Sequence, residues 1–326
     1  MAVGDLCDKL SRMTAIVTLT MNPAVDVNSE TEHVVPNRKL RCTESVREPG
    51  GGGINVARAV RLLGGNARAI FLVGGVVGAR LAVLVAEDGV ESHPIEIAGE
   101  TREVVNITER STGSQFRFVT EGPPVAEAEW NGVLETIRTL DPIPSYLVAS
   151  GTLPPGVPPD FYGRLSRIAA ERGMKLIVDT SGAPLQHAVG PGTFLIKPNL
   201  RELRELTGST GGALSDFFLE GVASAIVASG RSRGVVVSLG GGGAIIATER
   251  GTRRVSAPTV PVESRVGAGD SMVAGIVLSL ERGLPIEDAA LFGIAAGTAA
   301  VMMPGTQLCR REDAERLFDD VKRSVA

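Results

Sequence analysis

The sequence is poor in the residues that build most metal centres and redox sites. Its 326 residues include three cysteines, Cys7, Cys42 and Cys309, and three histidines. The cysteines lie far apart without paired spacing, and no His-x-x-His or His-x-Glu arrangement occurs. A cysteine-based metal site, a zinc site and a Ser-His-Asp mechanism are therefore disfavoured. So few cysteines are typical of a reducing compartment, and we predict a cytoplasmic protein.

Long apolar runs and an excess of positive charge are also missing. No apolar stretch approaches the ~20 residues that a membrane-spanning helix needs. The net charge is −4, which disfavours a nucleic-acid groove or a basic membrane-binding patch. The first dozen residues mix acids with bases and lack the apolar stretch of a signal peptide. We therefore expect no nucleic-acid partner and no membrane association.

Aromatic residues make up only 4% of the chain, whereas glycine occurs 40 times. Aliphatic strand-like runs alternate with helical patterns, which predicts an α/β fold: a doubly wound, mostly parallel sheet with helices on both faces. The predicted strands of this sheet are 15–20, 68–73, 146–149, 175–179, 194–197, 234–239 and 244–248. The predicted helices are 54–63, 79–87, 126–140, 159–171, a helix from 200, 269–282, 286–302 and 311–323.

Two further segments do not fit the rhythm of a buried parallel sheet. Residues 104–108 and 115–120 alternate polar and apolar side chains, as strands with one solvated face do. We assign about 27–48 and 100–120 to a small lid sheet inserted into the main fold. Residues 14–326 are then one domain, preceded by an N-terminal extension of residues 1–13.

The most informative motif is Gly267-Ala268-Gly269-Asp270, directly before an apolar helical pattern. Backbone N–H groups at a helix N-terminus bind anions. A carboxylate at the same place suits a group that takes a proton from a hydroxyl while the amides stabilise a phosphoryl group. Aspartate is also a favoured N-cap, so the motif alone fits a structural turn as well.

The common nucleotide-binding fingerprints are absent. There is no Walker motif, and the Rossmann pattern fails because Met272 stands at the third glycine position. A nicotinamide dehydrogenase is therefore disfavoured, and any nucleotide is bound by another loop geometry.

Four other segments carry candidate site residues. An acid, Asp26, follows the first strand, where ligands of open α/β sheets bind. The others are the glycine loop 50–53 with Asn55, the strand end 197–202 and the glycine turn 240–243. Taken singly, each segment is explained equally well as a cap, a turn or a solvated strand end.

Taken together and in this order, the five segments resemble the PfkB-type, or ribokinase-like, carbohydrate kinases. The resemblance runs from about residue 16 to about residue 318. Within that family the chain is most similar to the 6-phosphofructokinase branch, on the segments Lys39-Leu40-Arg41-Cys42-Thr43 and PGGGGINVAR at 49–58. In 1-phosphofructokinases and tagatose-6-phosphate kinases a lysine is usual where Gly52 stands here. The segment SGTLPPG at 150–156 also resembles the phosphosugar-kinase branch.

The resemblance implies an ATP- and Mg²⁺-dependent transfer of a phosphoryl group, most simply from ATP to fructose 6-phosphate. Asp270 would be the base, and the amides of Gly267, Ala268 and Gly269 would form the anion hole. Asn199 and Glu202 match the element that arranges magnesium through water. The implied nucleotide-binding residues are Lys197, Asn199, Glu202, Ser238, Gly240, Gly243 and Gly297.

On the sugar side, the resemblance implies contacts from Asp26, Asn55, Thr152 and the backbone of Gly51, Gly52 and Gly53. The cations expected in the lid strands around the substrate's own phosphate are Lys39, Arg102 and Arg117, because guanidinium groups suit bidentate phosphate recognition. For the arginines, plain surface charge is the alternative.

Some family members hold a monovalent cation through backbone carbonyls, for which Ser264 and Val266 are the candidates for K⁺. Gln307 and Thr152 stand where the phosphofructokinase form carries arginine and serine. Val35 stands where that form carries an aromatic residue at an allosteric ATP site, so inhibition by ATP is not implied.

Lid sheets of this type commonly pair between subunits, which covers their edges and predicts a homodimer. Two alternatives to the predicted activity stay open. One is phosphorylation of fructose 1-phosphate or tagatose 6-phosphate, and the other is a non-catalytic sugar or nucleotide sensor.

Overall fold

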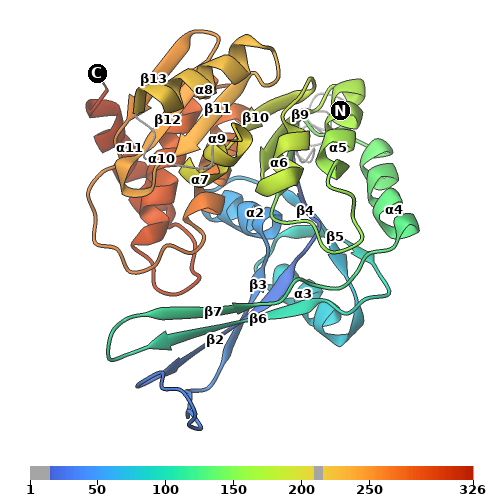
Figure 1. The fold of residues 1–326 in the computed structure, drawn as a ribbon, viewed down its shortest axis with the longest axis vertical. Coiled ribbons are helices and arrows are strands. Elements are labelled where there is room, and N and C mark those ends of the chain that lie inside the picture. Colours follow the sequence, from blue (N-terminus) through green and yellow to red (C-terminus); the bar gives the residue numbers. More distant parts are fainter. Residues whose placement is uncertain (1–14, 209–215, 326) are drawn as a thin grey trace, which may run out of the picture.

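Two sheets organise the chain in the computed structural model, which describes residues 15–208 and 216–325. The predicted N-terminal extension, residues 1–13, lies outside the described residues. The larger sheet has nine strands in the order β13-β12-β11-β10-β9-β8-β1-β4-β5, and the smaller has four in the order β3-β2-β6-β7. Figure 1 shows the smaller sheet projecting from the body of the molecule.

The nine-stranded sheet is parallel from β11 to β5, and only the pairings of β12 with β11 and with β13 are antiparallel. The predicted doubly wound, mostly parallel sheet is thus confirmed. Its strands are β1 (Ile16–Thr20), β4 (Arg68–Val73), β5 (Glu91–Glu96), β8 (Tyr146–Ser150), β9 (Lys175–Asp179), β10 (Thr193–Ile196), β11 (Gly234–Ser238), β12 (Ala244–Thr248) and β13 (Gly251–Val255).

Helices cover both faces of this sheet, and the strands read as continuous apolar runs for that reason. In β4, Ala69 and Phe71 face one core while Ile70 and Leu72 face the other. The first core is covered by α2 (Gly52–Leu62), α3 (Gly75–Glu87), α9 (Ala268–Glu281), α10 (Ile286–Val301) and α11 (Arg311–Arg323). The second is covered by α4 (Glu127–Arg138), α5 (Phe161–Arg172), α6 (Gly182–Ala188), α7 (Leu200–Leu206) and α8 (Asp216–Ala228).

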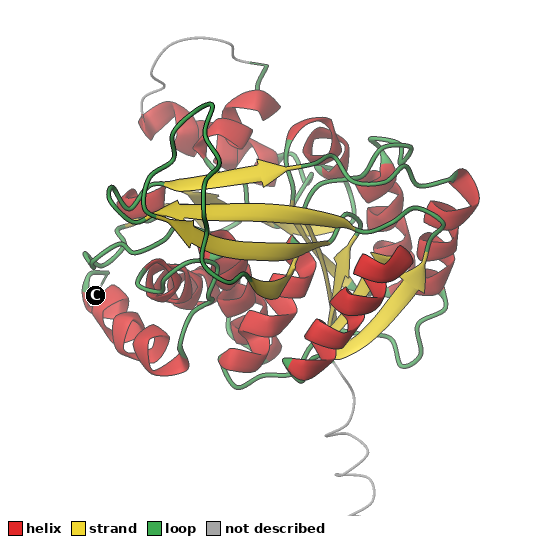
Figure 2. Cartoon of the chain, turned by 90° about the horizontal axis from the view of Figure 1, so that it is seen from below, coloured by secondary structure: helices red, strands yellow, loops and turns green. Residues whose placement is uncertain are grey.

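The four-stranded sheet is the predicted lid. It consists of β2 (Ala24–Thr31), β3 (Val46–Gly50), β6 (Arg102–Glu109) and β7 (Gln115–Val119). β2 pairs in parallel with β6, and the other two pairings are antiparallel. Figure 2 shows these strands lying across the body when the molecule is viewed from below. Because β1 leads through a short turn into β2, the lid is anchored beside β1 of the large sheet.

The chain order reverses at β1, which places a ligand site there. From β1 the sheet continues to β4 and β5 on one side and to β8, β9, β10 and β11 on the other. Ligands of open α/β sheets bind outside the carboxyl ends of the strands at such a switch point. The lid therefore lies next to the expected site.

Four elements were not predicted. β5 contains Pro94 and polar residues, and β13 contains two consecutive arginines. Both are edge strands, which carry charge and proline instead of an apolar pattern. The helices α6 and α8 also went unpredicted. Among the described residues, no helix combines the length and apolar character needed to cross a bilayer.

Candidate active site

Asp270 lies in the first turn of α9, at the helix end that carries unpaired amides. The N-cap, Gly267, has φ +75°, a left-handed conformation that favours glycine. A Cβ there would also lie 2.7 Å from Leu308 Cδ2. The amides of Gly267, Ala268 and Gly269 begin the helix, where no preceding turn can accept their hydrogen bonds. The sequence motif thus forms an anion-binding helix N-terminus with an acid inside it.

The environment of Asp270 suits a general base. Burial, together with the neighbouring Asp179 carboxylate, raises the pKa of Asp270 to about 6. A hydrogen bond from Asn55 Nδ2 to Asp270 Oδ2 (2.9 Å) and the charge of Lys197 act in the opposite direction. The carboxylate is therefore ionised at neutral pH but holds a proton more readily than a free aspartate.

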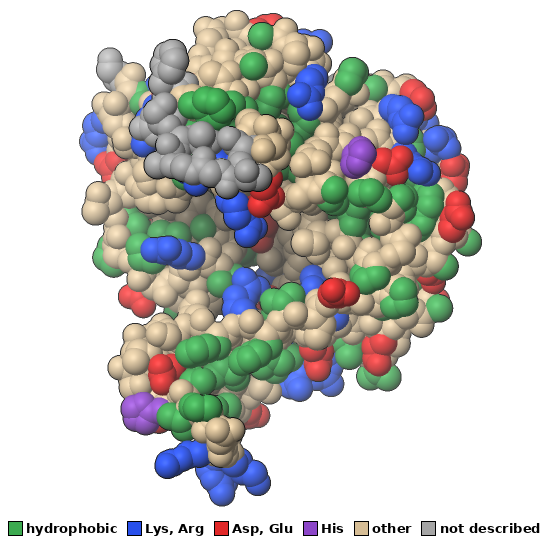
Figure 3. Space-filling view, in the orientation of Figure 1, with side chains coloured by type: hydrophobic (Ala, Val, Ile, Leu, Met, Phe, Trp, Pro, Cys, Tyr) green, Lys and Arg blue, Asp and Glu red, His purple; other side chains and the backbone are tan. Residues whose placement is uncertain are grey.

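A cavity of about 320 Å³ brings most of the predicted substrate residues together with Asp270. It lies between the lid and the carboxyl ends of the parallel strands. Figure 3 shows a hollow between lid and body, with Lys and Arg side chains gathered at it. The predicted residues that line the cavity are Asp26, Gly51, Gly52, Asn55, Arg102, Arg117, Thr152, Glu202, Val266, Gly267 and Asp270.

Asp26 lies inside the lid strand β2, so its predicted place directly after the first strand needs correction. Residues 21–23 turn the chain, and a new strand begins at Ala24. Asp26 is only 6% exposed, and burial raises its pKa to about 6 against the lowering effect of Arg117. A Cβ on Gly50 would approach Asp26 Oδ2 to 2.8 Å, so the glycine leaves room for the carboxylate.

The glycine loop packs tightly against the strand ends. A Cβ on Gly52 would lie 2.3 Å from Ser150 Oγ, and one on Gly53 would lie 2.6 Å from the Leu19 carbonyl oxygen. Gly52 and Gly53 form the first turn of α2, whose predicted start at Ile54 is therefore two residues late. Gly53 packs against Leu19 and Thr20 of β1 and does not line the cavity.

Arg102 and Arg117 reach the cavity from the neighbouring lid strands β6 and β7. Arg102 donates to the carbonyl oxygens of Thr120 (2.5 Å) and Asn22 (2.9 Å), while its buried Nε has no partner. Arg117 donates through Nε to Asn106 Oδ1 (3.0 Å). Burial lowers the pKa of Arg102, although Asp26 partly offsets this. Two cations thus lie beside a buried acid, an arrangement that suits a phosphorylated polyol.

Lys39 is not brought to this cavity. It lies in the exposed connection between β2 and β3, away from the described lining, and not in a lid strand as predicted. That connection is held at the far end of β2, where the Thr43 N–H donates to the Glu30 carbonyl oxygen (2.9 Å) and the Thr31 hydroxyl donates to the Arg41 carbonyl oxygen (3.2 Å).

Lys197 lies beside the anion hole, in an ion pair that the sequence did not predict. Its Nζ is 3.0 Å from Asp179 Oδ1, and it would lie 3.6 Å from a Cβ on Gly269. Burial acts to lower the pKa of Lys197, but the adjacent Asp179 carboxylate produces a net rise. Asp179 ends strand β9, as its place after the apolar run LIV could have indicated.

Asn199 and Glu202 form a capping box at the start of α7. Asn199 Oδ1 accepts from the Glu202 N–H (2.9 Å), and Glu202 Oε2 accepts from the Asn199 N–H (2.8 Å). Glu202 also lines the cavity, and burial raises its pKa. Only one of its carboxylate oxygens is used by the cap, so the other is available to a ligand. Asn199 is turned to its own helix, so the two side chains do not face the cavity together.

The remaining predicted nucleotide residues lie outside this cavity. Ser238 ends β11 and bridges to Asn199, while Gly240 begins the short turn η1 (Gly240–Gly242). Gly243 has φ +86°, and a Cβ there would overlap the Val255 carbonyl oxygen, so this glycine closes the hairpin. A Cβ on Gly297 would lie 3.0 Å from the Ala268 carbonyl oxygen, which gives Gly297 a packing role between α10 and α9.

The candidate K⁺ residues adjoin the anion hole. Ser264 is buried, and its Oγ accepts a hydrogen bond from the Val266 N–H (3.2 Å). In the part of the chain that the structure describes, no group of three or more His, Cys, Asp or Glu side chains is arranged to hold a metal ion.

The family model, the related sequences and the solved structures that match this chain all indicate one family. A family model described as pfkB family carbohydrate kinase matches residues 13–313. The ATP-dependent 6-phosphofructokinase isozyme 2 of Mycobacterium tuberculosis is 43% identical over 93% of this chain and 89% of its own length. The 1-phosphofructokinase of Bacillus subtilis is 29% identical over 94% of this chain and 98% of its own. The crystal structure of phosphofructokinase-2 from Escherichia coli in complex with potassium is 39% identical, covers 95% of this chain and 100% of its own, and superposes with a TM-score of 0.91.

Proposed function

This chain belongs to the pfkB family of carbohydrate kinases, and on that premise we propose that it is an ATP-dependent 6-phosphofructokinase. It transfers the γ-phosphoryl group of ATP to fructose 6-phosphate and releases fructose 1,6-bisphosphate and ADP. One observation carries the proposal: Asp270, at an anion-binding helix N-terminus, shares a cavity with Asp26 and with two arginines of the lid.

The chemistry follows from the position of Asp270. The sugar hydroxyl attacks the γ-phosphorus and loses its proton to the Asp270 carboxylate, while the bond to the bridging oxygen breaks and ADP departs with the electron pair. Amides of Gly267, Ala268 and Gly269 stabilise the charge on the transferred phosphoryl group. With a pKa raised to about 6, Asp270 is still mostly ionised at neutral pH, and it is more basic than an ordinary aspartate, so it accepts the proton more readily.

Recognition of the substrate's own phosphate is assigned to Arg102 and Arg117. Asp26 and Asn55 bind sugar hydroxyls, and the loop of Gly51, Gly52 and Gly53 with Thr152 shapes the wall. An unphosphorylated sugar would gain nothing from two guanidinium groups beside Asp26, so their presence favours a phosphosugar. Lys39 is proposed to act at the site only if a second subunit presents it there, because within one chain it lies apart.

The nucleotide is proposed to lie on the other side of Asp270, along the carboxyl ends of β10 and β11. Lys197 would contact its phosphates, and Ser238, Gly240 and Gly243 would border its base and ribose. Oxygen donors suit Mg²⁺, and the carboxylate oxygen of Glu202 outside the capping box fits that need, directly or through water, with Asn199 orienting the loop. A bound Mg²⁺ would supply charge neutralisation on the phosphates. Gly297 supports the wall by packing, and the carbonyls of Ser264 and Val266 remain the proposed K⁺ ligands.

The proposal includes a homodimer formed through the lid. Val105 is 37% exposed and Phe118 58% exposed on adjacent lid strands, an apolar surface that a second lid would cover. Residues 14–326 are taken as one kinase domain, and the cytoplasmic location stays part of the proposal. Sedimentation of the purified protein tests the dimer, and a strict monomer at working concentration would contradict it.

A coupled ADP-release assay over a panel of phosphosugars tests the proposed reaction. The proposal expects the highest kcat/KM with fructose 6-phosphate. A higher value with fructose 1-phosphate or tagatose 6-phosphate would assign the chain to one of those kinase activities instead. Failure to turn over any sugar, with ATP still bound, would favour the non-catalytic sensor.

A further inference from the structure

A row of hydrogen-bonded polar side chains crosses the lid, starting at Arg117, the arginine proposed to bind the substrate's phosphate. Arg117 on β7 donates through Nε to Asn106 Oδ1 on β6 (3.0 Å), and Asn106 donates through Nδ2 to Asn28 Oδ1 on β2 (2.9 Å). The three residues are register partners on neighbouring strands. The row therefore runs straight across the sheet, on the face that carries Asp26.

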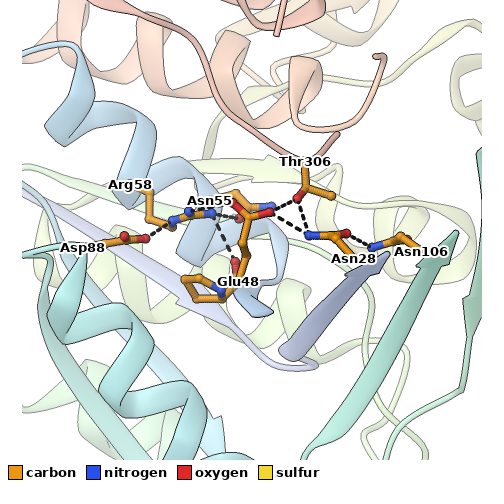
Figure 4. Close-up of polar contacts among 8 residues, drawn as sticks. Asn28, Glu48, Asn55, Arg58, Asp88, Asn106 and Thr306 are labelled. Atoms are coloured by element: carbon orange, nitrogen blue, oxygen red, sulfur yellow. Dashed lines mark hydrogen bonds and ion pairs between the residues drawn. The ribbon is translucent and has the colours of Figure 1, made fainter. Parts of the chain in front are cut away.

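The row ends at the junction between lid and body. Asn28 Nδ2 donates to Glu48 Oε2 on β3 (2.7 Å) and to Thr306 Oγ1 (2.9 Å), and the Thr306 hydroxyl donates to the same Glu48 oxygen. Thr306 belongs to the body, in the connection between α10 and α11. Leu308 of the same connection packs against Gly267 of the anion hole. Figure 4 shows this junction.

A weaker continuation leads from Glu48 toward the base. Arg58 Nη2 lies 4.0 Å from Glu48 Oε1, and Arg58 Nη1 donates to Asn55 Oδ1 (3.4 Å). Asn55 in turn donates to Asp270 Oδ2 (2.9 Å). The polar row therefore joins Arg117 on a lid strand to Asp270 on the body helix α9.

The row has only one consistent hydrogen-bond direction. An arginine can only donate and an ionised glutamate can only accept, so both asparagines must turn Oδ1 toward Arg117 and Nδ2 toward Glu48. With Nε committed to Asn106, the rest of the Arg117 guanidinium is left for the cavity, which it lines. Thr306 is 8% exposed, so its bond to Glu48 is well shielded from water.

We propose that Asn28, Asn106, Glu48 and Thr306 are positioning residues that hold the Arg117 guanidinium toward the substrate's phosphate and fasten the lid beside the anion hole. None of the four lines the cavity around Asp270. The proposal rests on the proposed phosphosugar kinase activity, and it assigns a function to a body residue, Thr306, through its effect on a lid residue.

The test compares Thr306→Val, which keeps the shape but removes the hydroxyl, with Thr306→Ser, which restores it. Asn106→Leu breaks the row at its centre. The matched control is Thr112→Val, which removes a lid hydroxyl bonded to Glu109 Oε2 (2.6 Å) at the β6–β7 turn, outside the row. The readouts are KM for the phosphosugar, KM for ATP, and the melting temperature.

The expected result is a roughly tenfold rise in phosphosugar KM for Thr306→Val and Asn106→Leu, because about 1.4 kcal/mol of oriented charge-assisted bonding to the phosphate is lost. KM for ATP stays within about twofold, and Thr306→Ser and Thr112→Val stay near wild type in both constants. An unchanged phosphosugar KM in both row variants would overturn the proposal. So would equal rises in both KM values with a lowered melting temperature, since those indicate a purely structural role.

The phosphosugar used is the one that the wild type turns over fastest. A wild type that prefers a sugar other than fructose 6-phosphate contradicts the proposed substrate, while the positioning role is still decided by the KM of the preferred one.

Discussion

The strands of the two sheets differ in how deeply they are buried and in how polar they are. Strand β1 of the large sheet is fully buried and carries no charged residue, whereas β2 of the lid, only a few residues later, carries Asp26, Asn28 and Glu30 on one face. Asp270 and the anion hole lie at the start of α9, which packs into a core of the large sheet, whereas Arg102 and Arg117 are held in the lid by polar contacts. In the proposed reaction, the body supplies the phosphoryl-transfer chemistry and part of the sugar site, and the lid supplies the cations for the sugar's own phosphate. Changes in each region should therefore affect different constants.

The largest effect is expected from Asp270→Asn in the body. The amide keeps the shape and the contact with Asn55 but cannot accept the hydroxyl proton, so kcat should fall by about 10³-fold. Isothermal titration should still detect ATP binding. If kcat changed by less than about tenfold, Asp270 would not be the base.

Leu19→Ala tests the body's role as a scaffold. Leu19 is fully buried in the core on one face of the large sheet, and its truncation should lower the free energy of unfolding by about 2–5 kcal/mol. Urea denaturation measures this. KM for both substrates should stay near wild type in the folded fraction. Val76→Ala, at a position 78% exposed on α3, is the control and should cost less than about 0.5 kcal/mol.

Arg117→Met tests the lid, and here the sugar KM and not kcat should change. Loss of a charge-assisted contact with the substrate's phosphate should raise the KM for fructose 6-phosphate by about 10–100-fold, since such bonds contribute about 1.5–3 kcal/mol. Steady-state kinetics should find kcat and the KM for ATP almost unchanged. A fall in kcat with an unaltered sugar KM would place Arg117 in the chemistry and erase the proposed division.

The pH dependence gives a smaller, graded effect. Asp270 must be ionised to accept a proton, and burial raises its pKa to about 6, so kcat should fall about tenfold per unit as pH drops below that value. Asp26, with a pKa also raised to about 6, should steepen the fall in kcat/KM. A flat profile down to about pH 5 would contradict these environments.

The raised pKa of Asp270 also makes the stability of the folded protein depend on pH. The folded protein holds the Asp270 proton more tightly than the unfolded chain does, so ionisation destabilises the fold above about pH 6. Asp270→Asn should therefore raise the melting temperature near pH 8, and this gain should vanish as the pH falls to about 4.

How much of this could be predicted from the sequence depended on the region. Strands such as β4 were predicted to the residue, because burial on both faces leaves an unbroken aliphatic run. The edge strands β5 and β13 were missed, because proline and charge replace that pattern where one side of a strand is free.

The site followed the same rule. Gly267 to Asp270 could be interpreted locally as the start of a helix, and the other four segments, taken together, favoured an active site over a structural turn. Asn106 and Thr306 depend on contacts between segments far apart in the chain, which no local pattern carries. Asn199 and Glu202 show the converse, since two residues predicted to bind a ligand also cap the helix α7.

The most direct test of the division between body and lid is the ratio of kcat/KM for fructose 6-phosphate to kcat/KM for fructose, measured in wild type, Asp270→Asn and Arg117→Met. We predict that Asp270→Asn lowers both values together and leaves the ratio nearly unchanged. Arg117→Met should lower the ratio about tenfold or more, because only the phosphorylated sugar loses a partner. An unchanged ratio in Arg117→Met would contradict the account, as would a ratio that collapses in Asp270→Asn.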